Sequence, residues 1–325
     1  MRYFLVFIKK LFLDIFGELL IVPIGIFYYL VFYNNKKDIN IVLCNHIGDI
    51  IFTLGYLEEY KLQKNVKNIN LIGTNKWKNL VGLYPNIYNE YYTIKSFWLK
   101  ILLYSAKREI GQSVYLKLKN VIFIDPGNNY TMGYNYAVKF PNSNLKDCIK
   151  YGCLNLEADS KFLAPHLILH SNKIKNFIND NNLLNKKAIL LCPYASVTNE
   201  IGNNFFEKLV TIYKRMGYLV ITNISNDEKA IKGTITIKCN FQEIFELGHY
   251  MECIIGLRSG ILDLLVFTNK LVISIYPKDN NMINFFDLCH TQENKNKLVL
   301  QYVMTNDYYK DIKYIIKNHK NLSNN

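Results

Sequence analysis

The chain has 325 residues, of which 50% are hydrophobic and 20% are charged. This composition excludes a disordered or collagen-like chain, and the length is enough for two domains of about 150 residues each. Lysine and arginine number 39 against 26 acidic residues, so the chain is basic, with a pI near 9.2. The basic residues form no block and no nucleic-acid-binding motif. A membrane surface or a phosphate-bearing substrate is therefore expected as partner ahead of nucleic acid.

The seven cysteines are odd in number, and none lies in a CxxC pair or with zinc-ligand spacing. Several lie in apolar runs, where a thiol behaves as a small hydrophobic side chain. The sequence therefore predicts that the thiols are reduced and lie in the core of a cytoplasmic protein, and it predicts no metal site.

The segment 1–37 is expected to associate with a membrane. Its apolar core, 11–33, is long enough to cross a bilayer core of about 30 Å. Asp14 and Glu18 interrupt it one helical turn apart, and a proline and a glycine follow. These features favour a helix that lies in or dips into the interface, because acidic side chains are costly at bilayer depth. A single span and a buried core helix are the alternatives. No small-residue cleavage site follows, which disfavours a signal peptide.

After 34–38, short β-branched runs alternate with amphipathic stretches, a rhythm typical of βαβ units and a parallel sheet. In the first half, strands are expected at 39–44, 69–73, 90–94 and 121–125, and a helix at 50–61. In the second half, strands are expected at 188–193, 218–223, 234–238, 252–257 and 270–277, and helices at 204–217, 241–251, 261–267 and 306–320.

The expected fold class is α/β, with two Rossmann-like parallel-sheet domains. The first covers 38–165 and the second 188–305, with a linker helix at 166–187 and a closing helix and tail at 306–325. Open parallel sheets bind ligands at the carboxyl ends of their strands, so a substrate is expected in a cleft that the two sheets face.

The first candidate site is the turn Asn45-His46-Ile47-Gly48-Asp49, between a strand and a helix. Gly48 permits a tight turn or a close backbone approach. Asp49 could act as general base toward an acceptor hydroxyl, or simply cap the helix. His46 is a second candidate base, or a polar loop residue.

The second candidate site runs from Leu257 to Asp263, again between a strand and a helix. The free N–H groups of the helix start, the Ser259 hydroxyl and the small Gly260 together suit a phosphate. Arg258 could clamp a diphosphate bidentately. The alternative is an Arg258–Asp263 ion pair with Ser259 as the helix cap.

Two further loops carry polar side chains. Ser196, Thr198 and Asn199 could donate to phosphate or sugar oxygens, or form an ordinary polar turn, and Glu228 could accept ribose hydroxyls. The sequence has no Walker A motif, no GxGxxG after a strand, no GxSxG, no HExxH and no suitable DxD. These absences argue against P-loop NTPases, dinucleotide enzymes, serine hydrolases and metal-dependent transferases.

Three segments in order resemble glycosyltransferase family 9, the ADP-heptose:lipopolysaccharide heptosyltransferases: GDIIFTLGYL at 48–57, PYAS at 193–196 and RSGILDLL at 258–265. The resemblance implies a GT-B fold and inverting, metal-independent sugar transfer from a nucleotide-diphosphate sugar, without a cofactor. It also implies that the acceptor binds the first domain and the donor the second. Asp49 matches the family's catalytic base, Ser259 and Gly260 its donor-diphosphate loop, and Ser196 a donor contact.

The sequence departs from the family pattern at several of these positions. Arg258 stands where the family has aspartate, Asp263 where it has histidine, Glu200 where it has a phosphate-binding lysine, and Gly55 where it has proline. Arg258 could replace the lost lysine, because either cation neutralises developing phosphate charge. The donor is therefore not expected to be inherited unchanged.

The resulting hypothesis is a membrane-associated glycosyltransferase at the cytoplasmic face of the cell membrane. It would act on a lipid-linked glycan in bacterial surface polysaccharide biosynthesis. The alternatives are a pyruvyl or phosphosugar transferase on the same scaffold, and a non-catalytic membrane scaffold of a polysaccharide assembly complex. Gly48-Asp49 and Ser259-Gly260 argue against the scaffold, which would need neither pair.

Overall fold

The computed structural model describes residues 16–34, 38–44, 46–124, 132–195, 201–225, 228–277, 281–288, 298–305 and 307–323. The chain divides into two compact units. Unit 1 comprises 1–81 and 85–163, and unit 2 comprises 82–84 and 164–325. The division falls just before the predicted 166–187 linker, whose helix belongs to unit 2.

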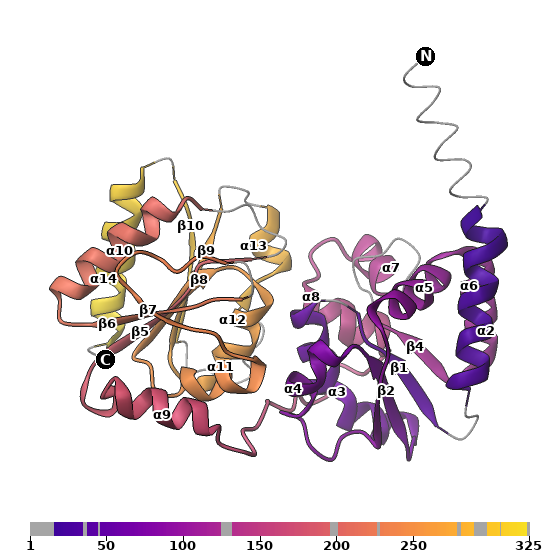
Figure 1. Cartoon of the computed structure of the whole chain (residues 1–325). Coiled ribbons are helices and arrows are strands. Elements are labelled where there is room, and N and C mark those ends of the chain that lie inside the picture. Colours follow the sequence, from indigo (N-terminus) through magenta and orange to yellow (C-terminus); the bar gives the residue numbers. More distant parts are fainter. Residues whose placement is uncertain are drawn as a thin grey trace. The chain divides into compact units, whose positions relative to one another are not determined.

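Unit 1 is built on a four-stranded parallel sheet in the order β3-β2-β1-β4, of which Figure 1 labels β1, β2 and β4. Its strands are β1 (Ile39–Val42), β2 (Ile69–Gly73), β3 (Glu90–Thr93) and β4 (Val121–Phe123). Its helices are η1 (Gly17–Ile21), α2 (Val22–Phe32), α3 (Ile47–Lys64), η2 (Asn75–Trp77), α4 (Lys78–Val81), α5 (Ser96–Lys107), α6 (Glu109–Leu118), α7 (Met132–Lys139), α8 (Leu145–Asp147) and η3 (Cys148–Cys153).

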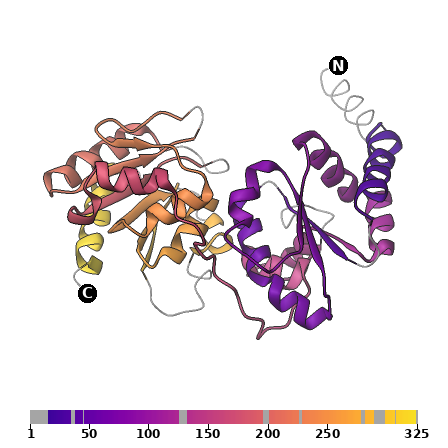
Figure 2. The same ribbon diagram turned by 60° about the horizontal axis from the view of Figure 1, so that its bottom comes forward.

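Helices α2, α5 and α6 cover one face of this sheet. Val42 of β1 and Ile72 of β2 share a buried cluster with Leu99 and Leu102 of α5 and with Tyr29 of α2. Because crossovers between parallel strands are right-handed and the strand order reverses at β1, α3 lies on the opposite face. Figures 1 and 2 both show α2 beside α5 and α6 at the edge of the unit, in agreement with their contacts.

Unit 2 contains a six-stranded parallel sheet in the order β10-β9-β8-β5-β6-β7. Its strands are β5 (Ala188–Cys192), β6 (Leu219–Asn223), β7 (Ile235–Ile237), β8 (Cys253–Leu257), β9 (Leu271–Tyr276) and β10 (Val299–Val303). Its helices are α9 (Asn172–Asp180), η4 (Leu183–Asn185), α10 (Asn203–Arg215), α11 (Phe241–Gly248), α12 (Gly260–Leu265), η5 (Val266–Thr268), α13 (Asn281–Phe285) and α14 (Tyr308–Ser323).

Both faces of the unit 2 sheet are covered, which explains why its central strands are almost continuously apolar. Phe205 and Tyr213 of α10 and Ile315 of α14 pack against Ile189 of β5 and Ile255 of β8 on one face. Helices α11 and α12 lie on the other face (Figure 1). The prediction of two parallel-sheet α/β domains is thus confirmed, and the predicted closing helix is the well-packed α14.

The amino-terminal segment is not separate from unit 1 in the part that the structure describes. Val22 and Tyr29 of α2 are fully buried against α5, α6 and the sheet. Among the described residues, no helix combines the length and the apolarity needed to cross a membrane. Residues 1–15 lie outside the described residues.

Candidate functional site

The candidate base Asp49 lies where the unit 1 sheet reverses its strand order. Strands β2 and β3 follow β1 on one side and β4 pairs with β1 on the other, so the loop after β1 leaves the sheet at its topological switch point. Open α/β sheets bind their ligands at such points. Asp49 is the third residue of α3 and only 6% exposed, and it accepts a hydrogen bond from the Cys44 thiol at 3.0 Å from Oδ2.

The other residues of this turn have local structural roles. His46 is the N-cap residue of α3, where its side chain makes no capping hydrogen bond, and it is exposed. Gly48 is the buried second residue of the helix. The helix dipole also stabilises the negative charge of Asp49 in the first turn of α3. A role of Asp49 at the helix start, the alternative to a catalytic base, therefore accounts for part of its position.

Gly55, which replaces the proline of family 9, has a packing reason in this chain. A Cβ atom at this position would lie 2.2 Å from the Phe162 ring, and the Gly55 carbonyl accepts a hydrogen bond from Leu163 N–H at 2.8 Å. The segment around Phe162 thus occupies the space that a larger residue at position 55 would need.

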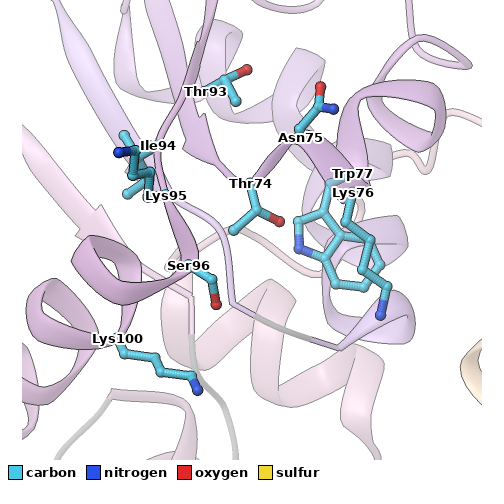
Figure 3. Close-up of a pocket in the computed structure, with 9 residues that line it drawn as sticks. All are labelled: Thr74, Asn75, Lys76, Trp77, Thr93, Ile94, Lys95, Ser96 and Lys100. Atoms are coloured by element: carbon cyan, nitrogen blue, oxygen red, sulfur yellow. The ribbon is translucent and has the colours of Figure 1, made fainter.

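A cavity of about 620 Å³ opens at the same carboxyl edge of the unit 1 sheet, after β2 and β3. It is lined by residues 74–77, residues 93–96 and Lys100. Three of these residues are lysines and none is acidic, so the cavity suits an anion (Figure 3). Figure 3 shows Lys76 beside the Trp77 indole, with its Nζ 4.6 Å from the ring centroid, and Lys100 on the other side of the cavity.

Sequence reasoning missed this cavity. Its lysines follow β2 (Lys76) and β3 (Lys95 and, within α5, Lys100), and these segments become neighbours only because β2 and β3 pair in parallel. The available signal was that both segments carry lysine beside small polar residues directly after a strand.

The candidate donor loop of unit 2 also lies at a switch point. Strand β5 pairs with β6 on one side and with β8 on the other, and Cys192 stands opposite Gly256. The loops after β5 and β8 therefore leave the sheet side by side. A Cβ atom at position 256 would lie 2.6 Å from the Cys192 carbonyl oxygen, so this close approach requires glycine.

Arg258 forms a buried ion pair with Asp263, as in the alternative that the sequence left open. Its Nη2 lies 2.8 Å from Oδ1 and its Nη1 3.1 Å from Oδ2, and the two side chains are 4% and 1% exposed. Its Nε also donates to the Phe286 carbonyl at 2.6 Å. Burial raises the pKa of Asp263, and Arg258 acts against that rise. The structure thus shows the ion-pair alternative, with the guanidinium bonded to Asp263, to the Phe286 carbonyl and to the Ser259 carbonyl. A contact of Arg258 with a diphosphate stays a prediction.

Ser259 is the N-cap residue of α12 and does not use its side chain as a cap. Its Oγ is buried and has no hydrogen-bond partner in the described part of the chain. Gly260 follows as the first, half-buried residue of α12. A buried hydroxyl without a partner is costly unless something occupies the site, so Ser259 is a good contact for a ligand at this edge.

The remaining predicted donor residues are only partly described. Glu228 closes its own loop, because its Oε2 accepts the Ser225 N–H at 2.6 Å. Burial raises the pKa of the Cys192 thiol at the end of β5, and Cys239 and Glu228 add to that rise. Ser196, Thr198, Asn199 and Glu200 lie outside the described residues. Within the described ranges, no group of three or more His, Cys, Asp or Glu side chains could hold a metal ion.

No protein-family model matches the sequence, and no curated protein matches it either. Solved structures do match the fold. A family 9 glycosyltransferase from Veillonella parvula aligns with a TM-score of 0.61 and 14% identity, over 89% of this chain and 98% of that chain. ADP-heptose lipopolysaccharide heptosyltransferase II from Escherichia coli aligns with a TM-score of 0.56 and 12% identity, over 88% of this chain and 98% of that chain.

The dodecameric iron-containing heptosyltransferase TibC of E. coli, solved in complex with ADP-D-β-D-heptose, also aligns. Its TM-score is 0.51 at 15% identity, over 76% of this chain and 60% of that chain. The chain thus has the GT-B fold found in glycosyltransferases of family 9, at a large distance in sequence. The family resemblance inferred from three short segments is confirmed at the level of the fold.

Proposed function

We propose that the protein is a glycosyltransferase that moves a sugar from a nucleotide-diphosphate sugar to a glycan acceptor. The observation that carries the proposal is the edge of unit 2 where β5 and β8 end. There the unpartnered Ser259 hydroxyl and the first N–H groups of α12 meet at a switch point of the sheet. The fold likeness to nucleotide-sugar enzymes supports the same assignment.

In the proposed reaction, Asp49 removes the proton of an acceptor hydroxyl. The hydroxyl oxygen attacks the anomeric carbon of the donor, and the bond from that carbon to the diphosphate oxygen breaks. The nucleoside diphosphate leaves with the electron pair, and the configuration at the anomeric carbon inverts. In this proposal the N–H groups of Gly260 and Ile261 and the Ser259 hydroxyl hold the developing charge on the leaving diphosphate.

The acceptor is proposed to bind unit 1, in reach of Asp49. The lysine-lined cavity after β2 and β3 offers a place for an anionic group of the acceptor, such as the phosphate of a lipid-linked glycan. We place the protein at the cytoplasmic face of the membrane, where such acceptors of surface polysaccharide assembly are found. The apolar amino-terminal segment supports this placement.

The first test is a thermal-shift panel of ADP, GDP, UDP and CMP on the full chain. A ligand at about 100 times its dissociation constant adds about 2.7 kcal/mol of stability. One diphosphate is expected to stabilise the wild type clearly more than the Ser259→Ala variant. Thr211→Ala is a matched control, because its hydroxyl donates within α10 and is exposed. If no nucleotide stabilises the protein, the donor assignment is wrong and a non-catalytic scaffold is favoured.

A further inference from the structure

The outward face of η1 and α2 is an unbroken apolar surface. Its exposed side chains recur every three or four residues, so they lie on one side of the helix. Leu19 and Phe27 are 68% and 67% exposed. Phe32, seven residues after the buried Gly25, is exposed at the end of α2 and is not part of this surface. The other exposed apolar residues on this segment are Phe16, Leu20, Ile24, Leu30 and Val31. We call this surface the α2 face; from position 19 to 32 the segment has no charged residue.

The opposite side of α2 is fixed to unit 1. Gly25 packs so closely on α5 that a Cβ atom there would lie 2.5 Å from Ser105 Oγ. The buried Tyr29 hydroxyl donates to the Asn120 carbonyl at 3.3 Å and accepts from Asn40 Nδ2 at 3.2 Å. The helix axis is therefore held along the surface of the unit, and the α2 face is presented outward along its whole length.

The neighbouring residues on α5 have the character of a membrane interface. Trp98 stacks on Tyr28 with ring centroids 4.3 Å apart, and Phe97 beside it is 65% exposed. Aromatic rings of this kind concentrate at the level of lipid headgroups. Lys95 and Lys100, also exposed, flank these rings on the first turns of α5.

Charge on the rest of the segment points to an anionic surface. Residues 1–15, which precede the α2 face in sequence, are largely apolar and include Arg2, Lys9 and Lys10. The whole chain carries a formal charge of +13. Apolar burial combined with attraction of lysine and arginine to anionic lipids is the usual basis of interfacial binding.

We propose that unit 1 docks on an anionic lipid bilayer through the α2 face, with α2 parallel to the membrane plane and Phe97 and Trp98 at headgroup level. This inference deepens the proposed membrane-bound transfer reaction and rests on it. Lys95 and Lys100 line the lysine-lined cavity and also flank Phe97 and Trp98. Docking would therefore bring the proposed acceptor site close to the lipid headgroups.

The test is flotation of the full-length protein with vesicles of pure phosphatidylcholine and of phosphatidylcholine with a quarter phosphatidylglycerol. The wild type is expected to float with the anionic vesicles. Leu19→Glu combined with Phe27→Glu is expected to lower the partition coefficient by about tenfold or more, because both apolar contacts are lost and negative charge is added. Circular dichroism and the melting temperature are expected to stay close to those of the wild type, since both side chains are exposed.

Leu19→Glu is also measured alone, with Leu62→Glu as its matched control. Leu62 is 70% exposed on α3, the helix on the other face of the same sheet, and its substitution should leave flotation unchanged. The proposal is overturned if the wild type does not float, or if the Leu19 and Leu62 variants behave alike. It is also overturned if sedimentation shows a stable dimer that Leu19→Glu dissociates, because a second copy would then cover the α2 face.

The nucleotide thermal shift, measured on the same samples, separates the two proposals. Nucleotide binding without flotation contradicts only the docking surface. Flotation without nucleotide binding contradicts only the transferase assignment.

Discussion

The Cys44 thiol, two residues after the end of β1, donates a hydrogen bond to Oδ2 of Asp49 in the first turn of α3, with 3.0 Å between sulfur and oxygen. Cys44 is itself only 2% exposed, so the proposed base is held by a buried donor from the turn that joins β1 to α3. One carboxylate oxygen is thus oriented by the fold, as expected for a group that must meet a substrate proton in a defined direction.

If Asp49 is the base, Asp49→Asn will lower kcat by about 10²- to 10⁴-fold, the usual contribution of general base catalysis. The thermal-shift panel identifies the nucleoside diphosphate that binds best, and the matching nucleotide sugar serves as the donor. Release of the nucleoside diphosphate from that donor measures kcat. Nucleotide binding should be unchanged, because Asp49 lies in unit 1. Cys44→Ser, which keeps a donor, should retain more activity than Cys44→Ala. Wild-type turnover by the Asn variant would remove Asp49 from the mechanism.

The Arg258–Asp263 pair leads to a prediction on stability. Arg258→Met leaves Asp263 buried without its partner, and breaking a buried ion pair in this way costs about 3–5 kcal/mol. The double variant Arg258→Met with Asp263→Leu should recover most of that loss, because it removes both charges. Urea unfolding followed by circular dichroism gives the free energies. A stable Arg258→Met protein that has merely lost nucleotide affinity would instead support a direct contact with the diphosphate.

Gly55→Ala should destabilise unit 1, although this exchange inside a helix ordinarily stabilises by about 0.5–1 kcal/mol. The added methyl group would meet the Phe162 ring, and overpacking of this kind costs about 1–3 kcal/mol. Thermal unfolding of Gly55→Ala in a Phe162→Leu background provides the control, since the smaller side chain makes room. Equal destabilisation in both backgrounds would show that the contact with Phe162 is not the cause.

His319 gives a prediction on pH. It is fully buried on α14, with Nδ1 3.1 Å from the Tyr213 hydroxyl, and burial lowers its pKa below 6.5 despite Glu252 nearby. At neutral pH the residue is uncharged in both the folded and the unfolded chain. As the pH falls through 6.5, the unfolded chain binds the proton first, so stability is lost toward acid pH.

The melting temperature should therefore fall between pH 7.5 and pH 5.5 less steeply in His319→Gln than in the wild type. The glutamine keeps a hydrogen-bonding group near Tyr213 but does not titrate. Differential scanning calorimetry at the two pH values measures the difference. Parallel slopes would mean that His319 does not contribute to the acid sensitivity.

Most of the strands could be predicted because each is a short apolar run between polar residues. Strand β2 has the predicted bounds 69–73, and β5 ends one residue earlier than predicted. Strand β10 was missed, since its apolar run at 299–303 follows the Asn- and Lys-rich segment at 291–297 and was not distinguishable from a loop. Local patterns therefore revealed most of the fold.

The candidate site was less accessible to sequence reasoning because its geometry depends on neighbours distant in sequence. The sequence placed Asp49 and Ser259 on strand-to-helix loops, and both lie at switch points. It did not reveal that Arg258 is bonded to Asp263 and to the Phe286 carbonyl. The spacing alone allows both a diphosphate clamp and an ion pair with Asp263. Nor did it reveal the cavity lysines, which only strand pairing brings together.

The pairing of β5 with β8 has a consequence for folding kinetics. The two strands are separated in sequence by β6, β7 and the helices α10 and α11, so their alignment requires closure of a long loop and is expected late in folding. The edge at which β5 and β8 end side by side, and after which Ser259 follows, does not exist before that alignment. A nucleotide bound there should therefore slow the unfolding of unit 2 while leaving its folding rate nearly unchanged.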